Sequence, residues 1–283
     1  MKATVICENC VFRGPPGIAE QGWDLLGEHG WAVFLETAAG NYLFDTGLGP
    51  TIINNARLLN LDLSSIKAII LSHCHHDHTG GLLPVLNEIK KKVPVSAHED
   101  LFRGNYIKYK GKLLSMGIQY TQAQLEEKGA EFIFNKGVKE IIPGVYLTGE
   151  VPRLTSFEKG DADLLMKKGE ELVPDPIMDD QSLVIKTDQG ISIILGCAHA
   201  GVINIIEYAK KITGEELIHT VIGGTHLQPV SAEQRDKSIE ALKTYNIARL
   251  GVSHCTGLPA FARLSQEFGD RFLSCNVGVV VEI

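Results

Sequence analysis

The sequence lacks any apolar run long enough to cross a bilayer, so it contains no candidate membrane span. Its first residues, MKATVICENC, have neither the apolar h-region nor the small-residue cleavage site of a signal peptide. From these two absences we expect a soluble, cytoplasmic protein without a membrane partner. The chain also has no excess of basic residues, since 27 Lys and Arg stand against 34 Asp and Glu and the formal net charge is −7. This balance disfavours nucleic acid as the main partner, because a phosphate backbone is bound by surplus Lys and Arg.

Cysteine is sparse as well, and its spacing disfavours cysteine-rich metal sites. Of the six cysteines in 283 residues, only Cys7 and Cys10 form a C-x-x-C pair. A four-cysteine zinc or iron–sulfur site needs a second such pair. We therefore interpret Cys7 and Cys10 as small residues at the end of a first strand, with a redox pair as the alternative. We expect all six thiols to be reduced.

What the sequence does contain is an alternation of strand and helix patterns, which indicates an α/β protein. Short apolar, β-branched stretches predict strands at 2–7, 66–72, 93–98, 182–187, 191–196, 219–224 and 247–254, and a hairpin over 31–47. Apolar residues at helical spacing predict helices at 79–92, 202–212, 238–246 and 257–269. Residues 101–175 have a different, more polar texture and are interpreted as an insertion, with a short helix at 121–130. The charged stretch 158–180 is expected to be loop.

The stretch LSHCHHDHTGGL, residues 71–82, is the strongest chemical signal. Imidazole nitrogen and carboxylate oxygen are ligands of zinc, iron and manganese. Directly after a strand, His73 and His75 share a face, whereas Asp77 and His78 begin the next helix and point elsewhere. The pattern therefore offers ligands to two neighbouring metals. His76 faces differently and is not expected to be a ligand.

This H-x-H-x-D-H-T-G-G pattern resembles the metallo-β-lactamase superfamily, and NYLFDTG, with Asp45, is similar to that family's first motif. The resemblance implies a single domain over 1–283, an αββα four-layer sandwich with an insertion at about 101–175. It implies two divalent metals at one edge between the sheets, zinc or else manganese or iron. Asp45 would support the metal loop.

The same resemblance points to ligands farther along the chain. His254, in LGVSHCTG, stands where the family places its last histidine. In GCAHAG, Cys197 occupies the place of the family's bridging aspartate and His199 lies two residues later, so His199 is the predicted ligand and Cys197 the alternative. Glu150, in LTGEVPR, stands where another family histidine is found. Glu150 is left open as a ligand, a substrate-facing residue or a surface residue.

Two further groups are candidates for the substrate side. His226 follows two glycines in VIGGTHL, which suggests close backbone approach beside an imidazole, and we predict that it acts on substrate. Asp77, His226 or water would supply the proton for a leaving group. In FRGNYIKYKGK, the basic and aromatic side chains of Arg103, Tyr106 and Lys108 suit an anionic small molecule. His29, His98 and His219 are interpreted as ordinary satisfied histidines.

These residues predict a metal-dependent hydrolase that uses metal-activated water on a small anionic substrate. An alternative comes from GCAHAG and GGTHL, which resemble a branch of the family that includes an archaeal dihydropterin–ribofuranosylaminobenzene 5′-phosphate synthase. A transferase of that kind would displace pyrophosphate. An iron-containing redox protein is less favoured, because His75 stands where the diiron members of the family carry glutamate. The sequence does not predict an oligomeric state.

Overall fold

The computed structural model describes residues 1–11 and 24–283. The chain forms two compact units. The first contains residues 1–102, 118–134 and 275–283, and the second contains residues 103–117 and 135–274. This division does not test the single domain expected over 1–283, which stays a prediction. None of the described helices is both long and apolar enough to cross a membrane.

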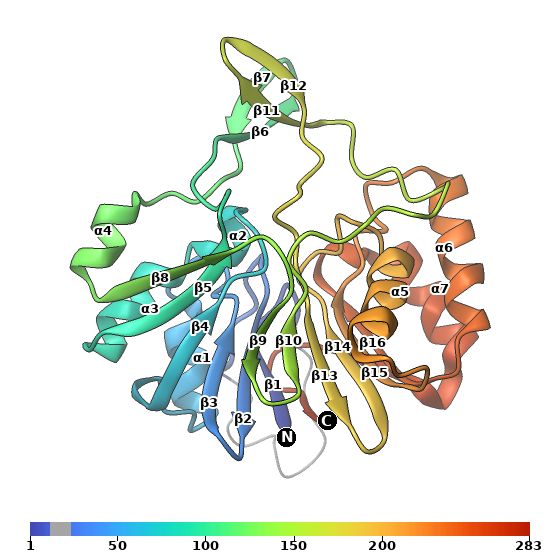
Figure 1. The fold of residues 1–283 in the computed structure, drawn as a ribbon, viewed down its shortest axis with the longest axis horizontal. Helices are drawn as coiled ribbons and strands as arrows, with labels where there is room; N and C mark the ends of the chain where they lie inside the picture. The colour runs from blue at the N-terminus through green and yellow to red at the C-terminus, as the bar shows by residue number, and fades with distance from the viewer. Residues whose placement is uncertain (12–23) are drawn as a thin grey trace. The chain divides into compact units, whose positions relative to one another are not determined.

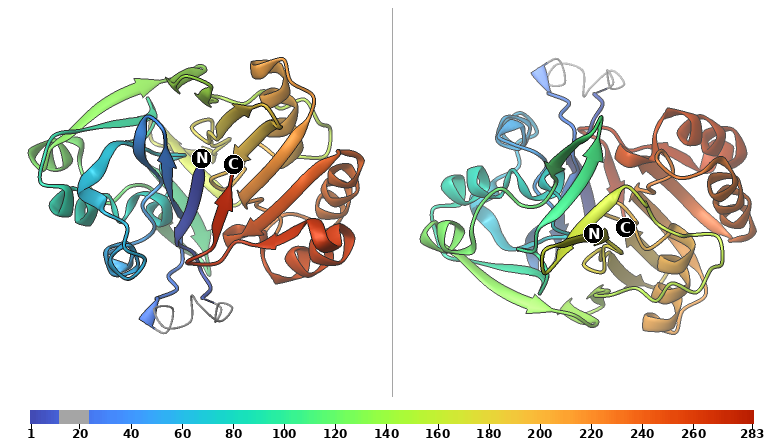
Figure 2. Two further views of the ribbon diagram at one scale, coloured as in Figure 1. Left: turned by 90° about the horizontal axis from the view of Figure 1, so that it is seen from below. Right: turned by 90° about the horizontal axis from the view of Figure 1, so that it is seen from above.

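A seven-stranded sheet forms the first unit. Its strands, in spatial order, are β18 (Val280–Glu282), β1 (Lys2–Cys7), β2 (Ala32–Thr37), β3 (Gly40–Phe44), β4 (Ile66–Ile70), β5 (Val93–His98) and β8 (Ala130–Asn135). β1, β2 and β3 are antiparallel, whereas β3, β4 and β5 run parallel. β1 and β18 pair, so the two chain ends lie side by side, with the Met1 nitrogen 3.0 Å from the Ile283 oxygen (Figure 2).

Helices cover one face of this sheet (Figure 1). They are α1 (Thr51–Leu58), α3 (Leu82–Ile89) and α4 (Gln122–Glu127), with the 3₁₀ turn η2 (Leu63–Ser65), and the short helix α2 (His76–Thr79) precedes α3 in the histidine loop. Ile52 of α1 and Leu82 and Leu86 of α3 are buried with sheet residues, as the 3.6-residue period of α3 predicts. The predicted helices at 79–92 and 121–130 are confirmed. A capping box between Thr121 and Gln124 starts α4.

The second unit contains another seven-stranded sheet. Its strands, in spatial order, are β17 (Phe272–Ser274), β16 (Ile247–Ser253), β15 (Ile218–Gly224), β14 (Gly190–Ile194), β13 (Leu183–Thr187), β10 (Val145–Leu147) and β9 (Lys139–Ile142). Strands β14 to β17 are parallel, so their carboxyl ends meet at one edge of the sheet. The loops that follow β14, β15 and β16 therefore begin side by side.

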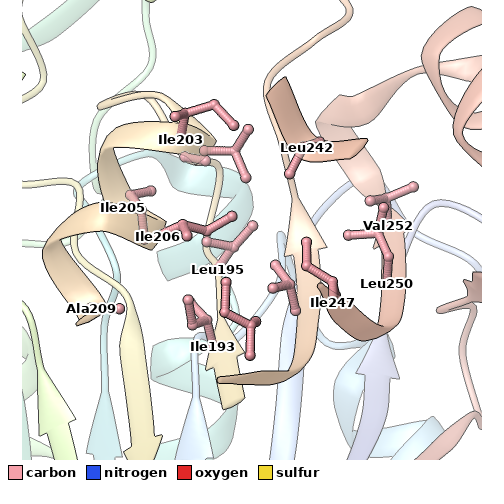
Figure 3. Close-up of a cluster of buried hydrophobic side chains, with 14 of the residues drawn as sticks. Ile193, Leu195, Ile203, Ile205, Ile206, Ala209, Leu242, Ile247, Leu250 and Val252 are labelled. Carbon is pink, nitrogen blue, oxygen red and sulfur yellow. The ribbon is translucent and has the colours of Figure 1, made fainter. Parts of the chain in front are cut away.

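Three helices pack on one face of that second sheet: α5 (Val202–Thr213), α6 (Ala232–Thr244) and α7 (Leu258–Phe268). Short 3₁₀ turns, η3 (His254–Thr256) and η4 (Gly269–Arg271), flank α7. Figure 3 shows the apolar face of α5, with Ile206, against Ile193 and Leu195. Burying these branched side chains fixes α5 over the end of β14, directly before the loop that carries Cys197 and His199.

The segment 101–175 contributes to three sheets. β8 joins the first large sheet, and β9 and β10 join the second. A separate four-stranded sheet has the order β12 (Glu171–Pro174), β11 (Leu164–Lys168), β6 (Asn105–Tyr109), β7 (Lys112–Ser115) (Figure 1). The expectation of loop over 158–180 is wrong for β11 and β12. Their side chains are mostly exposed, so no apolar alternation marks them in the sequence.

Candidate metal centre and active site

In the first unit, Asp45 and the histidine loop meet because they follow adjacent parallel strands. Asp45 comes directly after β3, and Ser72 and His73 come shortly after β4. The Asp45 side chain is fully buried, and its backbone has φ 59°, in the left-handed region. A strained backbone at a buried carboxylate is typical of a functional site.

Asp45 organises the loop through three short contacts of its own and a fourth that Ser72 makes. Its Oδ1 accepts from the Ser72 nitrogen at 2.7 Å, and its Oδ2 accepts from the Ser72 hydroxyl at 2.7 Å. Oδ2 also lies 2.7 Å from Nδ1 of His78. The Ser72 hydroxyl in turn lies 2.8 Å from Nδ1 of His73.

These contacts assign the proton on two imidazoles. An ionised carboxylate only accepts hydrogen bonds, so Nδ1 of His78 carries the proton and Nε2 keeps its lone pair. The single Ser72 proton is donated to Asp45, so Ser72 accepts from Nδ1–H of His73, and Nε2 of His73 also keeps its lone pair. Histidines that bind metals through Nε2 are held by carboxylates in this way.

The loop brings together the four ligands predicted within it. The His73 ring centroid lies 4.6 Å from that of His75 and 4.2 Å from that of His78. Oδ2 of Asp77 lies 3.9 Å from Nε2 of His78. All four side chains are nearly inaccessible to solvent. His76, which was not expected to be a ligand, is less buried and begins α2.

The two glycines after the loop are required by close backbone contacts. A Cβ atom on Gly80 would lie 2.0 Å from the Leu48 oxygen, and one on Gly81 would lie 2.0 Å from the Thr46 oxygen. The Thr46 nitrogen and hydroxyl both donate to the His78 oxygen at 2.8 Å. The two glycines of the motif and the Thr46 hydrogen bonds therefore hold the histidine loop against the segment that follows Asp45.

Sequence reasoning missed His29 as a neighbour of this loop. Its Nε2 lies 3.3 Å from Oδ2 of Asp77, although 59% of the His29 side chain is exposed. A Cβ atom on Gly30 would lie 2.5 Å from the Asp77 oxygen. No sequence signal separates His29 from a surface histidine, because the contact depends on how the residues before β2 pack on the loop.

In the second unit, three predicted residues lie in the loops that follow β14, β15 and β16. His199, His226 and His254 are all in these loops, and His199 and His254 are buried. Ala198, His226 and His254 have φ values of 60°, 51° and 53°. A left-handed conformation at a non-glycine residue costs of the order of 1 kcal/mol or more. Its repetition in all three loops is typical of a functional site.

His226 contacts other polar residues of its unit. Its ring centroid lies 4.0 Å from that of His199, and its Nε2 lies 3.6 Å from Oδ2 of Asp161. Its backbone nitrogen donates to Sγ of Cys255 at 3.3 Å. The ligand atoms of Cys197, His226 and Cys255 all lie within 4.8 Å of one another, close enough to hold a metal ion. His226 therefore has contacts suited to a ligand as well as to the predicted role on substrate.

The glycines before His226 serve the protein's own backbone. A Cβ atom on Gly223 would lie 2.4 Å from the Leu195 oxygen, and one on Gly224 would lie 2.6 Å from the Gly196 oxygen and from Sγ of Cys255. The close approach expected from the Gly-Gly pair is therefore to the end of β14 and to Cys255, within the second unit.

The electrostatics of this edge involve residues that the sequence did not single out. Burial lowers the pKa of His226, but Asp161 and Cys255 outweigh it and raise the pKa to about 9. Burial raises the pKa of the Cys255 thiol, yet its contacts with Cys197 and the nearby histidines bring that pKa well below the usual value. Thiolate and imidazolium are thus favoured together.

Asp180 is a further buried acid near His199. It accepts from the Ala200 nitrogen at 3.1 Å, and burial raises its pKa to about 7. Its Oδ1 has no hydrogen-bond partner among the residues described. The stretch DDQSL preceding β13 gave no recognisable motif, so only the packing of this loop against residue 200 identifies it.

A cavity of about 310 Å³ lies within the second unit. It is lined by Arg153, by the two short segments 159–162 and 174–177, and by His199. The cavity thus reaches a predicted metal ligand, and its walls include the side chains of Lys159, Asp161 and Asp175.

The structure gives Arg103, predicted to bind substrate, partners within the protein. Its guanidinium pairs with Asp175 and, at 2.5 Å, with Asp179, and both carboxylates are buried. Its charge is therefore committed to the protein, because two buried acids need it. Tyr106, under Lys167 at 5.4 Å, and Lys108 lie on β6, and the lining of the cavity includes neither. Their binding of substrate stays a prediction.

Glu150 lies just after β10. Its carboxylate is 3.4 Å from Nζ of Lys136, and 27% of its side chain is exposed. Of the three roles left open for Glu150, this ion pair favours the surface residue. All six cysteines are free, as expected, and Cys7 ends β1.

The chain is similar in sequence to one known protein family and to two proteins of a methanogenic archaeon. The model of the metallo-β-lactamase superfamily matches residues 26–254. A protein of Methanocaldococcus jannaschii, 7,8-dihydropterin-6-methyl-4-(β-D-ribofuranosyl)-aminobenzene-5′-phosphate synthase, is 31% identical over 264 residues, which cover 90% of each chain. An uncharacterised protein of the same organism is also 31% identical over 264 residues, 90% of this chain and 94% of its own.

The fold is also similar to that of solved structures. A metal-dependent hydrolase of the β-lactamase superfamily has a TM-score of 0.81 at 25% identity, over 100% of this chain and 99% of its own. Zinc-bound PqqB from Methylobacterium extorquens has a TM-score of 0.56 at 13% identity, over 100% of both chains, which shows a common fold. The predicted α/β fold class of the metallo-β-lactamase type is confirmed.

Proposed function

The chain belongs to the metallo-β-lactamase superfamily, and we propose that it is a metal-dependent hydrolase acting on a small anionic molecule. The observation that carries the proposal is the buried carboxylate of Asp45, 2.7 Å from Nδ1 of His78 and bonded to His73 through Ser72. A buried acid that leaves two Nε2 lone pairs available fits divalent metal binding.

We assign two metals, zinc in the first instance, to six side chains. The proposed ligands are His73, His75, Asp77, His78, His199 and His254, with Cys197 as a further candidate. Nitrogen, carboxylate and thiolate ligands of this kind suit zinc, and manganese and iron are the alternatives. The Asp45 and Ser72 contacts support Nε2 as the ligand atom of His73 and His78.

When bound, divalent metals at such ligands polarise a substrate oxygen and lower the pKa of water. The protein's own residues position the substrate and handle protons. His226, paired with Asp161 and held by Cys255, is set up to hold a proton on its ring and give it to a leaving group. Asp77 is the second proposed acid–base residue, and His29 contacts its carboxylate.

A second candidate is a transferase that displaces pyrophosphate. It is favoured by the 31% identity over 264 residues to the dihydropterin–ribofuranosylaminobenzene phosphate synthase. The same residues would then hold metals against a leaving pyrophosphate, and His226 would lie beside the leaving group.

The proposal is tested with purified protein of measured metal content. Ester, thioester and phosphodiester substrates are assayed before and after chelation, and activity should disappear on chelation and return with zinc or manganese. Full activity in metal-free protein would falsify the metal-dependent mechanism. The transferase is tested separately, by pyrophosphate release from a dihydropterin pyrophosphate with and without an aminobenzene riboside phosphate. Release that requires the amine favours the transferase over the hydrolase.

A further inference from the structure

From the lining of the cavity in the second unit, we infer an oxyanion-binding subsite formed by Arg153 and Lys159, which holds the phosphate of a phosphate monoester. The inference rests on the proposed function, since the cavity also reaches His199, a proposed metal ligand. It places the anionic end of the substrate on residues other than the basic hairpin of β6 and β7.

The first argument is the balance of charge around the cavity. Its walls contain two cations, Arg153 and Lys159, and two carboxylates, Asp161 and Asp175. Asp175 is occupied: it pairs with Arg103, accepts from Nδ2 of Asn105 at 2.6 Å and accepts from the Ile177 nitrogen at 2.8 Å. Two positive groups therefore face the cavity against one carboxylate, Asp161.

The carboxylate of Asp161 contacts its own loop and His226. Its Oδ1 accepts from the Asp163 nitrogen at 3.0 Å, and its Oδ2 lies 3.6 Å from Nε2 of His226. Each of its two carboxylate oxygens therefore contacts a group other than the two cations.

The second argument is how Arg153 is held. Its Nη1 donates to the His199 oxygen at 3.1 Å, and its Nη2 donates to the oxygens of Pro176 and Ile177. These hydrogen-bond partners are neutral carbonyls that fix the guanidinium. Its charge also acts on the buried carboxyls of Asp180 and Glu158, where it lowers a pKa that burial raises. Its buried Nε has no hydrogen-bond partner among the described residues.

Lys159 brings a second, adjustable charge to the lining of the cavity. Its backbone nitrogen donates to Oε1 of Gln234 at 3.2 Å, which anchors the loop, while its side chain is exposed. Gly160, at φ +77°, follows, and a Cβ atom there would lie 3.3 Å from Nη1 of Arg153. A glycine is thus needed where the loop turns over the guanidinium. A fixed planar cation and a flexible ammonium in the lining of one cavity suit a dianionic phosphate.

The test compares ribose 5-phosphate with ribose, which differ only in the phosphate, by calorimetric titration of the metal-containing protein. Acetate and inorganic phosphate are further arms, which separate carboxylate from phosphate as the recognised oxyanion. The wild type should bind ribose 5-phosphate and inorganic phosphate, and should bind ribose and acetate at least about tenfold more weakly.

Lys159→Gln should weaken ribose 5-phosphate binding about threefold to tenfold, and Arg153→Gln by more than about tenfold. Arg153 also donates to three backbone carbonyls, so Arg153→Gln can fail to fold. In that case Lys159→Gln alone tests the phosphate subsite. Lys211→Gln, which removes an exposed charge on α5, is the matched control and should bind like the wild type. Metal content is measured on every sample.

Unchanged phosphate binding in Lys159→Gln, or a loss in Lys108→Gln instead, would overturn the subsite. Tighter binding of acetate than of phosphate would overturn the phosphate assignment. Failure of the proposed function has a different signature, which is a protein that holds no metal while Lys159 still governs phosphate binding.

Discussion

Nδ1 of His78 lies 2.7 Å from Oδ2 of Asp45, although 33 residues separate them in the chain, and neither side chain is accessible to solvent. This contact orients the His78 ring within the histidine-rich loop. It does so because a buried carboxylate accepts a hydrogen bond from Nδ1–H of the ring and leaves the far ring nitrogen unprotonated.

Asp45→Asn should therefore weaken metal binding. An amide in place of the carboxylate no longer fixes the proton on His78, and we expect about 10- to 100-fold lower metal affinity. The measurement is competition with a zinc chelator, with circular dichroism to verify folding. Ser72→Ala, which removes the link to His73 and leaves Asp45 beside His78, should show a smaller loss. Asp188→Asn, in an exposed turn, is the control, and equal affinities in all three variants would contradict the role of Asp45.

The glycine after the motif should be intolerant of substitution. In Gly81→Ala the new Cβ atom would meet the Thr46 oxygen at 2.0 Å, so the loop must shift. We expect a loss of about 3 kcal/mol in the free energy of unfolding, measured by urea titration, together with loss of metal. Gly137→Ala is the matched control, because a Cβ atom there meets nothing within 4 Å. A Gly81→Ala protein as stable as Gly137→Ala would show that this backbone contact is not required.

His226→Asn should lower turnover about 100-fold while metal content is retained, if His226 acts on substrate. The matched control is His219→Asn, on β15, the strand that precedes His226, and it should have normal turnover. Metal content is measured by elemental analysis of both variants. Loss of metal in His226→Asn would instead make His226 a ligand with Cys197 and Cys255.

Arg103→Gln should destabilise the protein, because it leaves Asp175 and Asp179 buried without their cation. We expect a loss of about 3 kcal/mol in the free energy of unfolding, measured by urea titration. Lys108→Gln, at an exposed position on β6, should unfold like the wild type. A rise in KM for an anionic substrate with unchanged stability would restore the substrate-binding role predicted for Arg103.

Glu158 should make stability depend on pH in a defined direction. Burial raises the pKa of this carboxyl above 4.5, against the lowering effect of bonds from the Ile203 and Asn204 nitrogens at the start of α5. A raised folded-state pKa stabilises the fold below about pH 4.5 and loses that contribution as pH rises through the folded value.

The stability of the wild type relative to Glu158→Gln should accordingly fall from pH 4.5 upward. Thermal unfolding of both proteins across pH 4.5 to 8 measures the difference. Glu170→Gln, in an exposed turn, is the control and should run parallel to the wild type. A difference that grows with pH would mean that the helix contacts outweigh burial.

Much of the fold could be predicted from the sequence because the signals are local. The apolar periods of α3 and α5 and the β-branched stretches of β4 and β14 to β16 determine element type over a few residues. The short strands of the segment 101–175 were harder, since β11 and β12 have mostly exposed side chains. β11 pairs with β6, about 60 residues earlier, and no local sequence pattern predicts such a distant partner.

The sequence by itself determined that four candidate ligands lie within residues 73–78, that two glycines follow them and that Asp45 belongs with them. The tertiary structure alone decided the partners of charged side chains: Arg103 with Asp175, His29 with Asp77, and Arg153 with the carbonyls beside the cavity. The reason is physical. A charged residue looks the same in sequence whether it faces solvent, a buried counter-charge or a ligand, and only the packing of distant segments selects among them.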